Sequence, residues 1–117
     1  MRRLAITISL AMSCGGAAVV LTACGGDVGN NGDLVGGPCH NGHDCVDECA
    51  KGKDFPDGTC TVSCSEDHDC PDGTACVDKE GGICLLVCHH DDECRSAYSC
   101  KSTKREGHGG DTDVCID

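Results

Sequence analysis

Twelve cysteines between residues 39 and 115 fall into three groups of four, and this repeat constrains the fold more than any other feature of the chain. In every group five residues separate the first cysteine from the second, and three residues separate one group from the next. The first cysteine of each group follows that of the group before it by 24 or 25 residues, and such a period indicates an internal repeat. The groups are Cys39, Cys45, Cys49 and Cys60; Cys64, Cys70, Cys76 and Cys84; and Cys88, Cys94, Cys100 and Cys115.

An export signal precedes the repeat. A basic start at Arg2 and Arg3 is followed by a mostly apolar stretch that ends at Leu21, and small residues lie before Cys24. A membrane-spanning helix is the alternative, but two glycines and several alanines make the stretch a weak span, and no basic flank follows it. We therefore assign residues 1–23 to a signal peptide.

The end of this signal, Leu21-Thr22-Ala23-Cys24, resembles the lipobox of bacterial lipoproteins. The resemblance implies that the thiol of Cys24 is diacylated, that the chain is cut before it, and that the new amino group is acylated. Several acyl chains would anchor the protein to a membrane without crossing it. Gly25 stands where an inner-membrane retention signal would have Asp, so the outer membrane is favoured. A plain secreted protein cut near Ala23 is the alternative.

Composition makes the cysteines the main expected source of stability. The chain has one Phe, one Tyr and no Trp, so little apolar surface is available to offset the ordering entropy of a domain this size. An even number of cysteines in an exported chain indicates a disulfide framework, in which each bridge contributes roughly 2–4 kcal/mol. We expect a small disulfide-rich fold with six bridges, short strands and loops, and little regular secondary structure.

The net charge excludes one class of partner. Removal of residues 1–23 takes away two arginines and no acidic residue, which leaves 7 basic and 20 acidic residues and a net charge of −13. A surface this acidic repels nucleic acid. The expected partners are the membrane, through the lipid anchor, and an unknown extracellular protein or polysaccharide.

The chain divides into a signal, a tether and a domain. Residues 24–38 are rich in Gly, Asn and Asp, and we expect a flexible tether with a reach of roughly 20 Å. Residues 39–117 form the cysteine-rich domain, with repeats at 39–60, 64–84 and 88–115.

Each group of four cysteines is expected to form its disulfides within the group, and we favour bridges from the first cysteine to the third and from the second to the fourth. The best strand candidates are Thr61–Ser63 and Ile83–Val87.

An acidic residue comes directly before the second cysteine of every group, at Asp44, Asp69 and Glu93, and a Pro-Asp-Gly turn follows in two groups. This pattern resembles the tandem cysteine-rich modules of bacterial surface lipoproteins. More distantly, it is similar to Dickkopf-type N-terminal cysteine-rich domains and to whey-acidic-protein modules. The resemblance covers residues 39–117 and implies an extracellular binding role at the bacterial cell surface.

Two of the loops between cysteines combine imidazoles with dense carboxylates. Hard cations bind such oxygens and transition metals bind imidazole, so these loops are candidates for weak Ca²⁺ or Zn²⁺ binding, with a Ca²⁺ dissociation constant of roughly 10⁻⁴ to 10⁻³ M. The alternative is a solvated loop whose Asp or Glu caps a following turn. Structural zinc is disfavoured because no Cys-x2-Cys occurs. The candidate ligands are Asp67, His68, Asp69, His89, His90, Asp91, Asp92 and Glu93.

No motif points to catalysis. The polar loops lack a Gly-x-Ser-x-Gly elbow and have too little apolar wall to perturb a pKa, so we expect no enzyme and no cofactor beyond a weakly bound cation. The interpretation is a lipid-anchored exported protein with a non-catalytic binding or surface-structural role. The alternative is an extracellular protease inhibitor that uses the long loop 101–114, where three of the seven basic residues gather.

Overall fold

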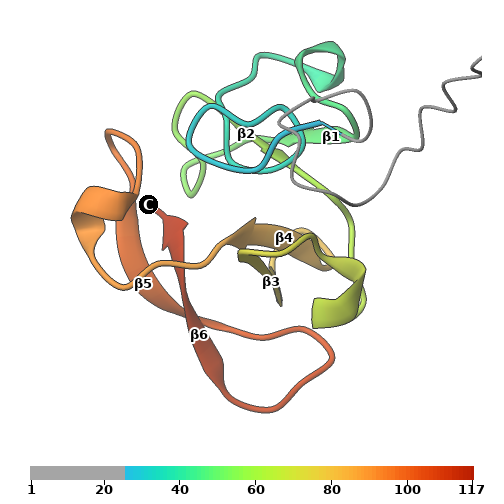
Figure 1. The fold of residues 1–117 in the computed structure, drawn as a ribbon, viewed down its shortest axis with the longest axis vertical. Coiled ribbons are helices and arrows are strands. Elements are labelled where there is room, and N and C mark those ends of the chain that lie inside the picture. The colour runs from blue at the N-terminus through green and yellow to red at the C-terminus, as the bar shows by residue number, and fades with distance from the viewer. Residues whose placement is uncertain (1–25) are drawn as a thin grey trace, which may run out of the picture.

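The computed structural model describes residues 26–117, so the predicted signal peptide and the predicted lipidation site Cys24 lie outside the described residues. Each four-cysteine group forms one module, a 3₁₀ turn followed by an antiparallel β-hairpin (Figure 1). Within residues 26–117 no helix has the length and hydropathy that crossing a bilayer requires. Module 1 comprises η1 (Gly42–Asp44), β1 (Glu48–Ala50) and β2 (Thr59–Thr61); module 2 comprises η2 (Asp67–Asp69), β3 (Thr74–Val77) and β4 (Ile83–Leu86); and module 3 comprises η3 (Asp91–Glu93), β5 (Ser99–Lys104) and β6 (Asp111–Ile116).

Two disulfides in each module, six in all, join the 3₁₀ turn to the hairpin of the same module. This confirms the expected disulfide-rich fold and the expected pairing. The third and fourth cysteines of a module lie directly opposite one another on the two strands, as Cys76 and Cys84 do. They are not bonded to each other, because each bonds to one of the two cysteines that flank the 3₁₀ turn. The bridges are Cys39–Cys49, Cys45–Cys60, Cys64–Cys76, Cys70–Cys84, Cys88–Cys100 and Cys94–Cys115.

Backbone hydrogen bonds close the hairpins of modules 2 and 3 into a ring. β3 pairs with β4, and directly after β4 the N–H of Cys88 donates to the carbonyl of Asp113 in β6 at 3.1 Å. β6 pairs with β5 along its whole length, and after β5 the N–H of Glu106 donates to the carbonyl of Cys76 in β3 at 3.0 Å. The four strands β3, β4, β6 and β5 therefore support one another.

A small apolar core lies where this ring meets module 1, and it is larger than the composition led us to expect. Alternate residues of three strands point to the same side, because strand side chains alternate with a period of two. Val77 and Val114 are completely buried. A few apolar residues are enough to form a core because the strands direct their side chains to the same place. The core contains Ala50, Phe55, Ala75, Val77, Ile83, Leu85, Val114 and Ile116.

The expected flexible tether differs from the structure over its described part, residues 26–38. Val28 forms a bridge with Val35, whose side chain is completely buried. Cys60 in β2 accepts a hydrogen bond from the N–H of Gly36 at 2.9 Å and donates one to the carbonyl of Gly37 at 2.8 Å. A Cβ on Gly36 would collide with the carbonyl of Gly29. The glycines that suggested flexibility instead allow a close approach between backbones, and we call residues 26–38 the N-terminal segment.

Candidate functional site

The acidic residue before each second cysteine caps the loop that begins its module. Its carboxylate accepts a hydrogen bond from the backbone N–H of the residue that follows the first cysteine. Such N–H groups have no acceptor in the backbone of a 3₁₀ turn, so a side-chain oxygen takes that place. The acceptors are Asp44, Asp69 and Glu93, and the donors are His40 at 2.7 Å, Ser65 at 2.9 Å and His89 at 3.0 Å.

A second carboxylate ties the turn to the hairpin in modules 2 and 3. Asp67 Oδ1 accepts a hydrogen bond from the N–H of Cys76 at 3.0 Å, and Asp91 Oδ1 accepts one from the N–H of Cys100 at 2.8 Å. Both carboxylates therefore hold the third cysteine of their module. Gly42 occupies the equivalent position in module 1 and has no side chain to make this bond. Most carboxylates of the predicted metal loops thus bind backbone donors.

Backbone hydrogen bonds also set the ionisation of two of these caps. The N–H of His40, followed by that of Asn41, lowers the pKa of Asp44 below its ordinary value. The N–H of Ser65 is the main cause that lowers the pKa of Asp69, and partial desolvation opposes it. Both side chains are thus held in the carboxylate form, which is the form that accepts hydrogen bonds from the backbone.

The predicted metal ligands lie in two different modules and do not converge on one point. His68 Nδ1 lies 3.2 Å from Glu66 Oε1, and His68 Nε2 lies 3.6 Å from Asp69 Oδ1. In residues 26–117, no cluster of three or more potential ligand atoms includes a His, an Asp or a Glu. Weak cation binding by these loops therefore stays a prediction, and the structure assigns Asp67, Asp69, Asp91 and Glu93 a capping role.

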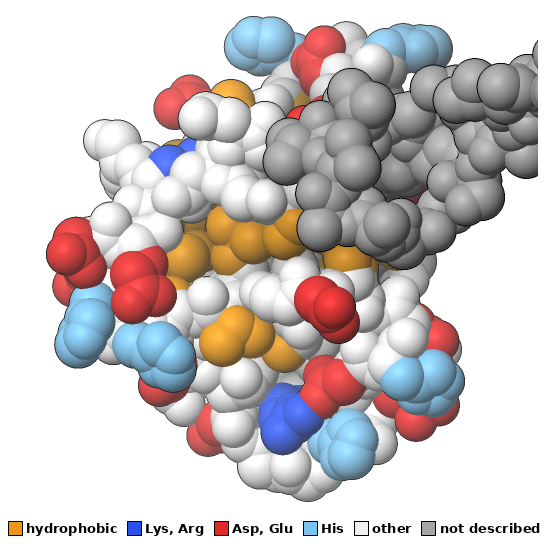
Figure 2. Space-filling model, in the orientation of Figure 1, with side chains coloured by type: hydrophobic (Ala, Val, Ile, Leu, Met, Phe, Trp, Pro, Cys, Tyr) orange, Lys and Arg blue, Asp and Glu red, His pale blue; other side chains and the backbone are white. Residues whose placement is uncertain are grey.

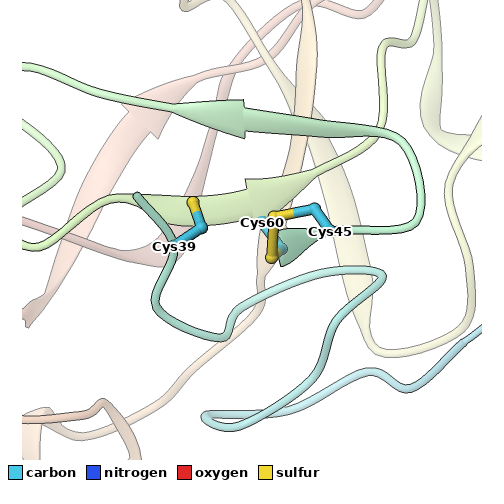
Figure 3. A group of neighbouring side chains, drawn as sticks. All are labelled: Cys39, Cys45 and Cys60. Atoms are coloured by element: carbon cyan, nitrogen blue, oxygen red, sulfur yellow. A yellow bond between two sulfur atoms is a disulfide. The ribbon is translucent and has the colours of Figure 1, made fainter. Parts of the chain in front are cut away.

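The tightest clusters of potential metal ligands are made of cysteine sulfurs. In module 1 the Sγ atoms of Cys39, Cys45 and Cys60 lie within 4.8 Å of one another (Figure 3), and each of the other modules has a similar trio. All cysteines among residues 26–117 are disulfide-bonded. A cysteine binds zinc as a thiolate, which a disulfide sulfur is not, so these clusters act as covalent braces in the oxidised protein.

The basic segment 101–114 is a β-hairpin, which corrects the expectation of a long loop. β5 and β6 pair over six residues each, and only residues 105–110 form the turn. Arg105 forms an ion pair with Asp67, and Lys104 Nζ lies 3.7 Å from Asp78 Oδ2. A Gly-rich turn between two segments that contain Thr and Val was the signal for a hairpin. Because Arg105 is paired, it is less available to a protease than the inhibitor interpretation requires.

Sequence reasoning missed a contact that joins modules 1 and 3. The hydroxyl of Tyr98 donates to the carbonyl of Pro56 at 2.9 Å, and the Arg95 guanidinium lies 4.3 Å from the centroid of the Tyr98 ring. Arg95 also donates to the Tyr98 hydroxyl at 2.8 Å and to the carbonyl of Gly58. Burial is the main cause that raises the pKa of Tyr98. Nothing in the local sequence indicated that the only tyrosine would reach a turn about forty residues away.

An open groove lies beside this contact, between modules 1 and 3. Its lining carries both charges, because it contains the guanidinium of Arg95 and the carboxylates of Asp44 and Asp57. Tyr98 holds the guanidinium in place. A fixed guanidinium loses little freedom when it binds a partner. The groove is lined by Pro38, Cys39, His40, Asp44, Asp57, Arg95 and Ser96.

Known proteins offer no guide to the role of this groove. No protein-family model matches the chain, and no curated protein or solved structure matches it either. The function is therefore argued from the residues themselves.

Proposed function

We propose that this protein is an exported lipoprotein, held on a membrane by acylated Cys24, whose domain has a non-catalytic binding or surface-structural role. The observation that carries the proposal is the complete oxidation of the described cysteines in three modules of the same design. Numerous disulfides indicate an oxidising, extracellular environment. The lipobox-like residues before Cys24 add the anchor.

The state of the polar side chains supports a non-catalytic role. Asp44 and Asp69 have lowered pKa values and bind backbone N–H groups, whereas a general acid needs a raised pKa and a free path to substrate. The histidines of the loops between cysteines are exposed to solvent, as the pale blue side chains in Figure 2 illustrate. A rigid domain with exposed polar loops is suited to binding an extracellular protein or polysaccharide.

Membrane fractionation tests the anchor. We expect Cys24→Ser to move the protein from the membrane fraction to the soluble fraction, because the thiol that carries the lipid is lost. Cys14→Ser is the matched control, since it changes another cysteine of the predicted signal and leaves the lipobox intact. If the Cys24→Ser protein stays as membrane-bound as the control, the anchor assignment is wrong.

Binding is tested at the groove between modules 1 and 3. The oxidised domain, immobilised on beads, is used to capture partners from intact cell envelopes. Ser96→Trp fills the groove without removing a described hydrogen bond, and Ser102→Trp places the same bulk on the exposed face of β5. We expect the first variant to lose captured partners and the second to keep them. Equal capture by both variants would exclude the groove.

A further inference from the structure

The chain is already held against the domain at Gly26, which follows the cysteine that we propose to be acylated by two residues. A Cβ on Gly26 would collide with Val46 Cγ2, so the backbone there lies directly against module 1. The N–H of Asp27 donates to Asp33 Oδ1 at 2.7 Å, and the carbonyl of Asp27 accepts from the N–H of Leu34 at 2.9 Å. The chain is therefore fixed to the domain from Gly26 onward.

This attachment limits how far the domain can lie from its anchor. Consecutive Cα atoms are about 3.8 Å apart, so the step from Cys24 to Gly26 spans at most about 7 Å. A free tether over residues 24–38 would allow roughly 20 Å. Acyl chains on Cys24 would place that residue at the membrane surface. The part of the domain around Gly26 must then lie at the lipid headgroups.

The exposed apolar side chains are distributed as such a contact requires. Three large apolar residues among the described ones are exposed, namely Val28 at 39%, Val46 at 52% and Val87 at 41%. Two of them adjoin the point where the chain enters the fold, since Val46 packs against Gly26 and Val28 follows it by two residues. We call Val28 and Val46 the valine surface. In Figure 1, β1 and β2 lie at one end of the domain and the turn of the β5–β6 hairpin lies at the other.

We propose that the valine surface lies on the headgroup region of the membrane that holds Cys24 and so fixes the orientation of the domain; this rests on the proposed acylation. Exposed side chains next to these valines include Asp27, Asp33 and Asp47, whose carboxylates repel anionic lipids. The lipid surface is therefore a zwitterionic one. Two valines expose too little area to bind a membrane alone, so the contact depends on the acyl chains.

Tryptophan fluorescence tests this contact because the chain has no native Trp. Val46→Trp places the fluorophore on the valine surface, and His108→Trp places it on the exposed turn of the β5–β6 hairpin. The acylated full-length proteins are inserted into phosphatidylcholine vesicles that carry a spin label on some headgroups. We expect quenching of the Trp at position 46 to be several times stronger than at position 108. Equal quenching at both positions would overturn the proposal.

Two further samples separate the contact from the anchor. Cys24→Ser combined with Val46→Trp must fail to float with the vesicles, which shows that the new Trp does not itself cause binding. If the acylation-competent protein also fails to float, both the anchor and the contact are wrong; flotation with equal quenching contradicts the contact alone. Replacing part of the phosphatidylcholine by phosphatidylglycerol should weaken quenching at position 46, and unchanged quenching would contradict the preference for zwitterionic lipid.

Discussion

Modules 1 and 2 share one four-cysteine frame but hold their hairpins in different ways. In module 2 the carboxylate of Asp67 accepts a hydrogen bond from the N–H of Cys76 and so ties the turn to β3. In module 1 Gly42 takes the place of that carboxylate, and among residues 26–117 no side chain bonds the N–H of Cys49 in this way. The N-terminal segment instead pairs with Cys60 on the other strand of the hairpin. The disulfides thus decide which turn meets which hairpin, and a separate device completes each hairpin edge.

The two modules also differ in what they give to the core. The strands of module 2 contribute Ala75, Val77, Ile83 and Leu85, whereas module 1 contributes Ala50 and Phe55. Because β3 and β4 of module 2 are two of the four strands in the ring, opening module 2 removes support from module 3 as well. We therefore expect module 2 to be the most stable part of the protein and module 1 to depend on the N-terminal segment.

Removal of one disulfide from each module should have the largest effect. Cys70→Ala with Cys84→Ala opens module 2, and Cys45→Ala with Cys60→Ala opens module 1, and each double variant leaves no unpaired thiol among residues 26–117. Each loss should cost about 2–4 kcal/mol of unfolding free energy, and the loss in module 2 should be the greater because the core loosens with it. Urea unfolding followed by circular dichroism measures both. A larger loss in module 1 would contradict the comparison.

Truncation of Val77 should have the next largest effect. This side chain is completely buried in the core, so Val77→Ala should cost about 1–3 kcal/mol of unfolding free energy. Val46→Ala in module 1 is the matched control, because Val46 is half-exposed and its truncation should change the free energy by less than about 0.5 kcal/mol. Similar urea midpoints for the two variants would show that the core contributes little.

Exchange of the carboxylate tie between modules should have a smaller effect. Asp91→Ala removes the acceptor of the Cys100 N–H and should cost about 1 kcal/mol. Gly42→Asp offers module 1 the missing carboxylate, and a Cβ there meets no atom within 4 Å. We expect Gly42→Asp to raise the thermal midpoint slightly and Asp91→Ala to lower it. A midpoint that falls in both variants would show that the frame of module 1 cannot use such a tie.

Acid titration should give the smallest effect. Backbone donors lower the pKa values of Asp44 and Asp69, so the folded protein binds fewer protons than the unfolded chain at acidic pH. The stability that these carboxylates contribute is complete above the unfolded pKa of about 3.9 and is lost as the pH falls through the lower folded values. Asp44→Asn with Asp69→Asn should therefore flatten the decline of the thermal midpoint below about pH 4. Parallel declines in both proteins would contradict the capping role.

Cysteine spacing predicted much of this frame and little of what completes it. Recurring gaps indicated that each group closes on itself, and the bridges from first to third and from second to fourth cysteine follow that pattern. The recurring acid at Asp44, Asp69 and Glu93 was visible, and its capping of a turn was among the interpretations of these loops. Both features are local, which is why the sequence reveals them.

Long-range contacts could not be read in the same way. The segment at residues 26–38 has the composition of a linker, and only its fit against Cys60 and Val46 makes it ordered. Tyr98 reaches Pro56 across two modules, and no periodicity indicates that distance. Alternation of small apolar residues, such as Ala75 with Val77, spans too few residues to announce a core.

Hydrogen exchange at three equivalent amides tests the carboxylate tie most directly. The N–H groups of Cys76 and Cys100 donate to Asp67 and Asp91, and the N–H of Cys49 has no such partner among residues 26–117. Measured by NMR and corrected for intrinsic rates, exchange at Cys49 should be at least about tenfold faster than at the other two. Asp91→Ala should accelerate exchange at Cys100 and leave Cys76 unchanged. Equal protection of all three amides, or no response of Cys100 to Asp91→Ala, would contradict the assignment of these carboxylates to the backbone.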